Sequence, residues 1–345
     1  MASITTTKTI TTPKIKNLYV YPIKSFKGIT LQNAIITERG LAIPNINGNK
    51  SIDRLWCVCD TDGYVQDIRV QPHFATIAVE IDYQHNCLVL TPTLDDDIKE
   101  FDPLKIPIHN EAFYENSGEE HVVNVSDRYK NYWYGHPLNG YNCGEEAANW
   151  ITRFIHKHNE YSEDQEFLFL RYKQSSKRRI SEMFKGKSDI AKRAMPNDQA
   201  AFADCSPFHL ISTESMLDLN RRLPANASCE NPVSIFRFRP NIEVECAKQA
   251  YDEDKWMTFN IGKASFRQLG PTGRCVIPTT SPMKGKRYDD EEPRATLMKY
   301  RPLPYGDGPH GGPILGIWMA PQANVEQHVT IGDVITEVGN DPMKL

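Results

Sequence analysis

The run Thr76-Ile77-Ala78-Val79-Glu80-Ile81 places apolar side chains at every second position, where Ile77, Val79 and Ile81 alternate with small or polar residues. This period of two is typical of a strand with one buried face. Similar short runs, separated by turn residues, lie on both sides of it: Leu18-Tyr19-Val20-Tyr21, Ala34-Ile35-Ile36-Thr37, Leu55-Trp56-Cys57-Val58-Cys59 and Cys87-Leu88-Val89-Leu90. The first third of the chain is therefore predicted to form a β-barrel or a β-sandwich.

The spacing of apolar residues changes to that of a helix at two places. Residues 142–158 carry one apolar face, and Asn142 with Glu145 three residues later predicts a capping box at its start. A second helix is predicted at residues 213–223, with Ser212 or Thr213 as its N-cap. Both helices are expected to lie at the periphery of the β-structure.

Strands dominate the rest of the chain. They are predicted at residues 166–170, 241–245, 257–261, 265–269, 274–279, 314–319 and 329–338. Helices do not alternate with these strands, which argues against a doubly wound parallel sheet. Residues 174–197, rich in Lys, Arg and Ser, are predicted to form a long, partly mobile loop near the domain boundary. The expected fold class is α+β and mostly β.

The composition is that of a globular protein, with 40% apolar and 24% charged residues. At roughly 100–200 residues per domain, the length of 345 residues indicates two domains. The formal charge of -4 predicts no overall positive field that would recruit nucleic acid or an anionic membrane. No run reaches the roughly 18 apolar residues of a membrane-spanning helix, and residues 1–13 lack the pattern of a secretory signal. A cytoplasmic location and a disordered tail at residues 1–15 are expected, and an association with mitochondria is the alternative.

Common catalytic and nucleotide-binding motifs are absent from the sequence. Neither a G-x-G-x-x-G after a strand nor G-x-x-x-x-G-K-[ST], G-x-S-x-G or H-E-x-x-H occurs. The eight cysteines can be interpreted as four disulfides, as zinc sites or as separate thiols. A reducing cytosol disfavours disulfides, and Cys57 with Cys59 has no second pair of ligands to complete a zinc site. Separate thiols are therefore favoured, with Cys57 and Cys59 as small buried residues.

Cys275 stands in a different setting, the segment Leu269-Gly270-Pro271-Thr272-Gly273-Arg274-Cys275-Val276-Ile277-Pro278, which is predicted to turn between two strands. Glycines let backbone N–H groups approach an anion, and Arg274 would favour the thiolate that a metal ligand or nucleophile requires. The spacing alone leaves two interpretations open, a functional thiolate and a turn cysteine without a role.

Basic and hydroxyl residues recur at other predicted strand ends, and each taken singly is interpreted as a solvated surface group. These segments are Tyr21-Pro22-Ile23-Lys24-Ser25-Phe26-Lys27-Gly28, Asp53-Arg54-Leu55-Trp56 and Phe236-Arg237-Phe238-Arg239-Pro240-Asn241. In order with Asn142-Cys143-Gly144-Glu145, Ala203-Asp204-Cys205-Ser206-Pro207-Phe208 and Gly273-Arg274-Cys275, they resemble the MOSC-domain proteins. The resemblance is strongest to the amidoxime-reducing components, and the matching segments extend from Leu18 to beyond Asp333.

This resemblance implies an N-terminal β-barrel-like domain at residues 16–165 packed on a MOSC β-barrel at residues 166–341. A molybdenum cofactor (Mo-molybdopterin) would lie between them, and Cys275 would be the thiolate ligand of the metal. The residues that the resemblance implies around the phosphate and pterin are Lys24, Ser25, Arg54, Arg239, Asn241, Asp204, Cys205 and Ser206, with Gly273 and Arg274 beside the metal.

The sequence departs from the family pattern at three places. The usual T-x-R-Q-x-P run appears as Asp67-Ile68-Arg69-Val70-Gln71-Pro72, so Arg69 alone is carried over as a cofactor-binding residue. Gly273 stands where a serine often precedes the R-C pair, which removes one side-chain donor near the metal. The membrane-anchoring helix of such proteins has no counterpart in residues 1–13.

The activity implied by the resemblance is reduction of small N-hydroxylated compounds such as amidoximes and hydroxylamines. The sequence has no haem, flavin or iron–sulfur motif, so electrons are expected from a separate b-type cytochrome and its NADH-dependent flavoprotein reductase. The basic stretch from Lys177 to Arg193 is either a docking surface for an acidic partner or a solvated loop. Two rival functions stay open: a non-catalytic cofactor carrier or sulfur-transfer module, and a metal-free binding barrel in which Cys275 would be dispensable.

Overall fold

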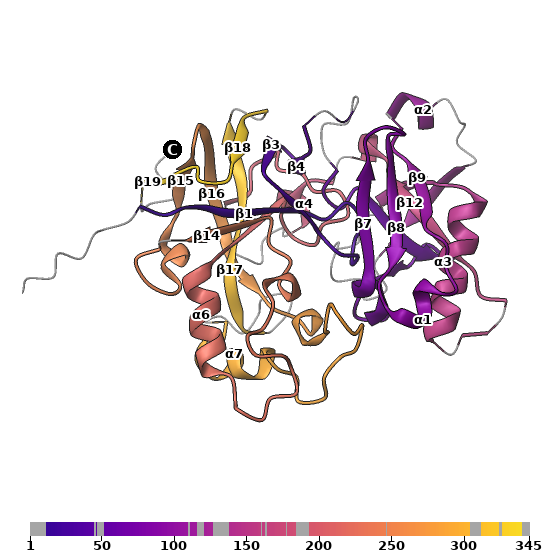
Figure 1. The fold of residues 1–345 in the computed structure, drawn as a ribbon. Coiled ribbons are helices and arrows are strands. Elements are labelled where there is room, and N and C mark those ends of the chain that lie inside the picture. Colours follow the sequence, from indigo (N-terminus) through magenta and orange to yellow (C-terminus); the bar gives the residue numbers. More distant parts are fainter. Residues whose placement is uncertain are drawn as a thin grey trace, which may run out of the picture.

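The computed structural model describes residues 12–44, 46, 52–109, 111–115, 121–126, 138–159, 161–162, 164–176, 178–183, 193–245, 247–303, 312–323 and 326–339. Most of the predicted tail, Cys246 and residues 184–192 of the predicted basic loop lie outside these ranges. The described chain forms two β-rich lobes that lie side by side (Figure 1). The predicted α+β, mostly β fold class is confirmed.

The larger lobe is built on an eight-stranded sheet with the strand order β19-β15-β16-β17-β13-β14-β1-β2. In chain order these strands are β1 (Lys14–Val20), β2 (Ile29–Leu31), β13 (Phe208–Ser212), β14 (Ile242–Glu245), β15 (Thr258–Ile261), β16 (Ala264–Gly273), β17 (Ile314–Ala323) and β19 (Ile335–Gly339). The sheet curls back on itself, because Val334, directly before β19, forms a bridge with Lys14 in β1. This closure gives the lobe its barrel form.

The smaller lobe contains two further sheets. A five-stranded sheet has the order β10-β11-β12-β5-β6, and its strands are β5 (Trp56–Asp60), β6 (Val65–Gln66), β10 (Val122–Val125), β11 (Leu138–Asn142) and β12 (Phe167–Tyr172). A meander is formed by β7 (Ile77–Asp82), β8 (Cys87–Pro92) and β9 (Leu104–Pro107). The alternating run at residues 76–81 is thus a strand, with Ile77 and Val79 buried.

The first strand, β1, belongs to the sheet of the larger lobe, although the residues that follow it form most of the smaller lobe. β1 pairs antiparallel with β14, with Leu18 opposite Ile242, so it lies among strands far away in sequence (Figure 1, indigo). β3 (Asn33–Thr37) pairs with β4 (Gly40–Ala42) and also with the late strand β18 (His328–Thr330). Early and late strands of the chain therefore pair with each other. The domain boundary between residues 165 and 166 stays a prediction.

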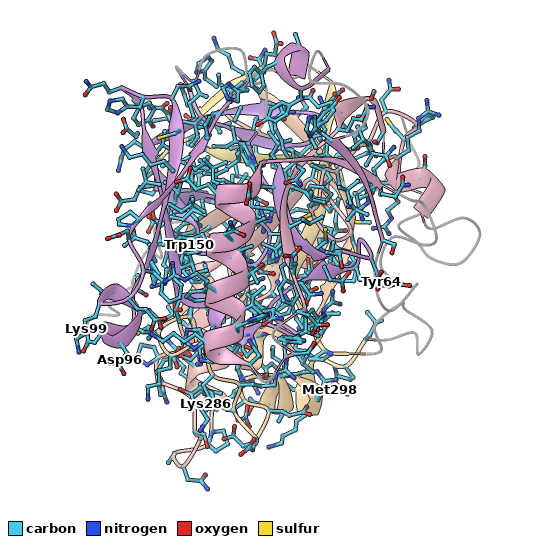
Figure 2. All side chains as sticks on the ribbon, turned by 90° about the vertical axis from the view of Figure 1, so that its right-hand side faces the viewer. Tyr64, Asp96, Lys99, Trp150, Lys286 and Met298 are labelled. Carbon is cyan, nitrogen blue, oxygen red and sulfur yellow. The ribbon has the colours of Figure 1, made fainter. Side chains whose placement is uncertain are left out.

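Helices cover the outside of the lobes. They are α1 (Asp95–Ile98), α2 (Glu111–Glu115), α3 (Glu145–His158), α4 (Ile180–Met183), α6 (Thr213–Arg222) and α7 (Arg294–Tyr300). Figure 2 shows α3 on the face of the smaller lobe, with Trp150 midway along it. In the described part of the chain, no helix has the length and apolar content needed to cross a membrane.

Of the two predicted caps, one is right and one is wrong. Ser212 is the N-cap of α6, and its side chain accepts a hydrogen bond from the backbone N–H of Ser215. The N-cap of α3 is Gly144 at φ 102°, while Asn142 Oδ1 accepts from Gly144 N at 3.0 Å. Asn142 therefore bonds one residue ahead of the helix, and the predicted capping box does not form.

The segment around Cys275 also differs from its prediction. β16 continues through the Gly/Pro-rich stretch to Gly273, and residues 277–279 form a 3-10 helix instead of a strand. The backbone of Val276 is in the α region, and Pro278 is held at the second position of this helix. A proline fits a first helical turn, where its missing N–H is not needed.

Candidate functional site

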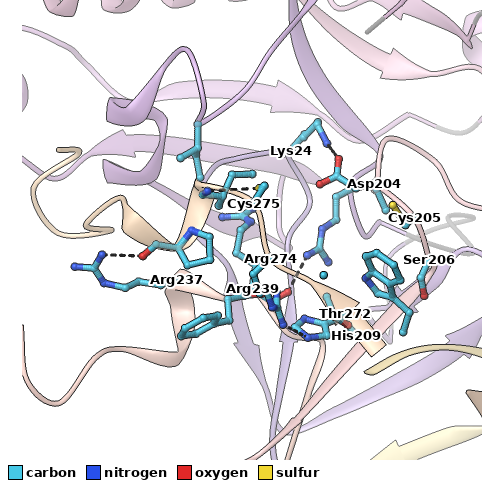
Figure 3. Close-up of a pocket in the computed structure, with 18 of the residues that line it drawn as sticks. Lys24, Asp204, Cys205, Ser206, His209, Arg237, Arg239, Thr272, Arg274 and Cys275 are labelled. Atoms are coloured by element: carbon cyan, nitrogen blue, oxygen red, sulfur yellow. Dashed lines mark hydrogen bonds and ion pairs between the residues drawn. The ribbon is translucent and has the colours of Figure 1, made fainter. Parts of the chain in front are cut away.

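A pocket with about 810 Å³ of empty space, partly open to solvent, lies where segments of both lobes meet (Figure 3). The expected cofactor-binding residues line it together, with the exception of Arg69: they are Lys24, Ser25, Arg54, Asp204, Cys205, Ser206, Arg239, Asn241, Gly273, Arg274 and Cys275. The sequence therefore identified residues that the fold brings to one place, although their roles stay a prediction.

Lys24 and Asp204 form an ion pair across the two halves of the chain (Figure 3). Lys24 follows β1, and its Nζ also donates to Phe202 O at 3.1 Å. Burial alone would raise the pKa of the Asp204 carboxyl, but the charges of Lys24, Arg69 and Arg178 hold it below its ordinary range. Asp204 is therefore an anion at neutral pH.

Arg69 is bound by the residue that departs from the family pattern. Its Nε lies 2.9 Å from Asp67 Oδ2, and the two side chains form an ion pair. Asp67 thus holds the guanidinium of Arg69 outside the lining of the pocket, and the charge of Arg69 acts on Asp204 from there.

Two arginines lie against the ring of Tyr21. The guanidinium of Arg54 is 4.3 Å and that of Arg239 is 4.4 Å from the ring centroid, distances typical of cation–π contacts. Both residues have left-handed backbones, with φ of 49° and 53°. Burial lowers the pKa of Arg239 to about 10, and the like charge of Arg54 adds to this effect. An anion between the two guanidiniums would relieve their repulsion.

Arg274 is buried in the wall of the pocket and does not face the thiol beside it. Its Nε donates to Leu315 O at 3.0 Å and its Nη1 to Phe238 O at 3.1 Å, while Nη2 contacts the ring of His209. Burial, and then the charge of Arg274, hold the pKa of His209 well below its ordinary value. The neutral His209 ring can accept this hydrogen bond, so Arg274 fixes the end of β16 to β13 and β17.

A β-bulge in β17 presents the carbonyl that Arg274 binds. Pro271 pairs with Ile317 but Gly273 pairs with Ile314, so β17 has one extra residue at this point. Gly316 within the bulge has φ 75°, which glycine adopts at low cost. Leu315 has no partner in the register at this point, and its carbonyl oxygen accepts a hydrogen bond from Arg274.

Cys275 lies at the junction of β16 and the 3-10 helix. Its Sγ is 3.5 Å from Ile277 N, which donates to it. Burial raises the pKa of this thiol and the charge of Arg69 lowers it, while burial lowers the pKa of Arg274 and the charge of Cys275 raises it. The attraction between the two charges agrees with the expectation that Arg274 favours the thiolate, although the hydrogen bonds of Arg274 go to His209 and Leu315.

Three of the expected polar residues bond mainly to the protein itself. Ser206 Oγ donates to backbone carbonyls, with Phe208 O at 2.6 Å and Met319 O at 2.9 Å. Asn241 accepts from His209 N at 3.2 Å and donates to Asp53 Oδ2 at 3.0 Å. Ser25 Oγ accepts from Ile68 N at 3.1 Å. These contacts shape the pocket, and they leave few free hydrogen-bonding groups on these side chains.

The remaining free groups suit an anionic cofactor with a soft metal. Arg239 Nη2 and Thr272 Oγ1 are buried without a hydrogen-bond partner among the described residues, and both residues line the pocket. A Cβ added at Gly273 would meet nothing within 4 Å, so the backbone there borders open space. Guanidinium donors match a phosphate, and a thiol suits a transition metal. The residues present therefore fit a molybdenum cofactor.

The lining residues that the sequence missed include His209, Arg237, Thr272 and Trp318. Arg237 was part of a quoted basic segment, but nothing separated it from a surface charge. His209 and Trp318 lie opposite each other in β13 and β17, and of these two only Trp318 was in a predicted strand, at residues 314–319. Only the pairing of these strands reveals that they reach the pocket.

The other cysteines agree with the expected separate thiols. Every cysteine that the structure describes is free, and Cys57 and Cys59 are fully buried in β5. Among the described residues no group of three or more His, Cys, Asp or Glu side chains is placed to hold a metal ion. Neither a disulfide framework nor a zinc site is formed in this part of the chain.

Comparison with known proteins gives two family matches, the MOSC N-terminal beta barrel domain at residues 12–158 and the MOSC domain at residues 197–336. Mitochondrial amidoxime reducing component 2 of Bos taurus is 31% identical over 288 residues, which are 83% of this chain and 72% of the relative. Mitochondrial amidoxime-reducing component 1 of Homo sapiens is 29% identical over 287 residues, with the same coverage. Molybdenum cofactor sulfurase of Bos taurus is 26% identical over 313 residues, which are 85% of this chain and 29% of the relative. The chain thus belongs to the family of MOSC-domain proteins that carry a MOSC N-terminal beta barrel domain.

Proposed function

We propose that the protein is a molybdenum-cofactor-dependent oxidoreductase that reduces N-hydroxylated compounds such as amidoximes and hydroxylamines. The observation that supports this most is the convergence of Cys275 with cationic side chains from both lobes in one pocket. The similarity to amidoxime-reducing components agrees with it.

Each group in the pocket has a role in this proposal. Cys275 Sγ would be the protein ligand of molybdenum, and Arg54 and Arg239 would bind the phosphate of the cofactor through charge-assisted hydrogen bonds. Thr272 Oγ1 and Arg239 Nη2 would find their missing partners there. Arg274 would position Cys275 through Leu315 O and His209. The bound cofactor would supply two-electron oxygen-atom transfer.

Asp204 would orient the substrate. Its carboxylate stays ionised because Lys24, Arg69 and Arg178 lower its pKa against the effect of burial. A carboxylate with so low a pKa is a poor general acid at neutral pH but a good hydrogen-bond acceptor. It would accept from an N–H or O–H of the substrate, while Lys24, its ion-pair partner, keeps its position.

Electrons would come from outside the chain, from a b-type cytochrome reduced by an NADH-dependent flavoprotein. The partner and the proposed cytoplasmic location rest on the sequence, while the amidoxime-reducing relatives bear the word mitochondrial in their names. A reconstituted chain of cytochrome and reductase tests the partner, since omission of the cytochrome should abolish NADH-dependent turnover.

The deciding experiment measures Mo and released pterin in purified protein, together with benzamidoxime reduction, for wild type, Cys275→Ser and Cys229→Ala. Cys229 is a buried thiol of a separate core cluster and serves as the matched control. We expect wild type and Cys229→Ala to hold Mo and reduce benzamidoxime, and Cys275→Ser to lose the activity. Protein without Mo from a cofactor-replete host would refute the proposal.

The similarity to molybdenum cofactor sulfurase supports a second candidate, a cofactor carrier or sulfur-transfer module. The same pocket would then bind the cofactor without turnover. Bound Mo in a protein that reduces no N-hydroxylated compound would favour this candidate.

A further inference from the structure

A second recess, which measures about 840 Å³ including the solvent at its open side, adjoins the Cys275 pocket. Its walls are mostly apolar and include Ile68, Ala75, Phe236, Ile277, Pro282 and Met283. The two cavities share Ile68, Arg237, Arg239 and Ile277, and Ile277 N is the donor to Cys275 Sγ. A ligand in the recess would therefore lie next to the Cys275 segment.

The rim of the recess is apolar and exposed, whereas its deeper wall carries buried hydroxyl groups. Met283 is 72% and Phe236 is 36% exposed, so two large apolar side chains reach the surface at the same recess. Deeper in the wall, Tyr21 Oη and Thr280 Oγ1 are buried and have no hydrogen-bond partner among the described residues. A buried hydroxyl without a partner carries a desolvation cost, and a ligand in the recess could relieve it for both groups.

Lys27 adds a positive charge to the same wall. Its Nζ donates to Thr93 Oγ1 at 2.8 Å, and among the described residues it forms no ion pair. Burial lowers the pKa of this ammonium. A carboxylate in the recess would compensate the lost hydration of the ammonium, and the two hydroxyls could donate to the same ligand.

We propose that this recess binds the apolar body of the substrate and that Lys27 and Thr280 select substrates whose body ends in a carboxylate. The inference rests on the proposed function, since the N-hydroxyl group would extend from the recess to the Cys275 pocket. Apolar walls favour an aromatic or aliphatic body, while the ammonium and the hydroxyls favour an anionic end group.

A matched pair of substrates tests this selection on the holoenzyme. Benzamidoxime with a 4-carboxylate is compared with its neutral 4-carboxamide, in wild type, Lys27→Met, Thr280→Val and the control Lys263→Met. Lys263 is an exposed lysine in the turn between β15 and β16 and does not line the recess. Melting temperature and Mo content are measured for each variant, and calorimetry measures binding of 4-phenylbutyrate, which has no reducible N–O bond.

We expect wild type to have a KM about tenfold lower for the carboxylate than for the carboxamide, as for one charge-assisted hydrogen bond. Lys27→Met should abolish this difference, Thr280→Val should reduce it severalfold, and Lys263→Met should retain it. Phenylbutyrate affinity should follow the same order.

Three results would separate the alternatives. Equal KM values for the two substrates in wild type and Lys27→Met would overturn the inference and leave the proposed function intact. Loss of Mo or pterin from Lys27→Met would assign the recess to the cofactor and also overturn it. Lys27-dependent binding of phenylbutyrate by a protein that reduces neither amidoxime would refute the proposed function and keep the carboxylate site.

Discussion

Gly316→Ala should destabilise the protein at the point where the larger sheet holds the Cys275 segment. Gly316 has φ 75°, and an added Cβ would lie against the carbonyl oxygen of Leu210 and within 2.8 Å of His209 Nε2. Neither contact is relieved by rotating a flexible side-chain end, because Leu210 O is backbone and His209 is held by Arg274. The bulge or the neighbouring strand β13 must therefore shift.

Two terms set the size of this effect. A left-handed backbone costs alanine about 1–2 kcal/mol, and forcing atoms into a packed region costs about 1–3 kcal/mol. Together they lower the free energy of unfolding by about 2–5 kcal/mol. A shift of the bulge would also move Leu315 O away from Arg274, so the variant should retain less cofactor than wild type.

Gly273→Ala is the matched control, because Gly273 lies on the paired strand β16 and its added Cβ meets nothing within 4 Å. Urea denaturation at pH 7 should place it within about 1 kcal/mol of wild type. A Gly316→Ala protein that unfolds at the same urea concentration as Gly273→Ala would refute the steric argument and the role given to the bulge.

Two further predictions concern stability. The native pKa of Asp204 lies below its unfolded value, so its contribution is present above about pH 4 and is lost as the pH falls through the native pKa. Asp204→Asn should lower the free energy of unfolding by only about 1 kcal/mol at neutral pH, because 34% of the side chain is exposed and solvent screens its ion pair. The urea midpoints of variant and wild type should converge on acidification. Curves of urea midpoint against pH that stay parallel would contradict this. Ser212→Ala should cost about 1–3 kcal/mol at pH 7, since Ser212 Oγ caps α6 and donates to the buried Glu253 Oε2 at 2.8 Å, and an unchanged urea midpoint would show that the cap is not needed.

Local patterns were sufficient for most elements of the fold. Alternation predicts β7, and the cap residue Ser212 predicts the start of α6, because both depend on neighbours in the sequence. The strand predicted at residues 274–279 does not form. These residues suit both a strand and a short 3-10 helix, and Pro278 favours the helix. The pairing of β1 with β14 was not predictable, since β-propensity does not specify a partner.

In the site, too, the sequence identifies candidate residues but does not predict the hydrogen-bond partners of single side chains. The sequence identified Ser206 and Asn241 as candidates, but their hydrogen bonds to Met319 O and Asp53 could not be foreseen. It also could not foresee that Arg274 donates its hydrogen bonds to Leu315 O and His209 and not to the adjacent thiol, because the direction of the guanidinium depends on the bulge in β17. Residue type predicts which groups are near the pocket, whereas the tertiary hydrogen bonds decide which of them remain free.

The cations of the pocket are therefore not equivalent, although the sequence gives no reason to rank them. Arg54 is balanced by the buried Asp53, whose Oδ2 lies 2.6 Å from Arg54 Nη1, and Lys24 is balanced by Asp204. Arg239 and Arg274 form no ion pair among the described residues and bind carbonyl oxygens instead. Because a buried cation without a counter-ion carries an uncompensated desolvation cost, an anionic ligand gains most from these two arginines. The affinity for a phosphate-bearing cofactor should then come mainly from Arg239, which still has a free donor, while Arg54 sets the geometry.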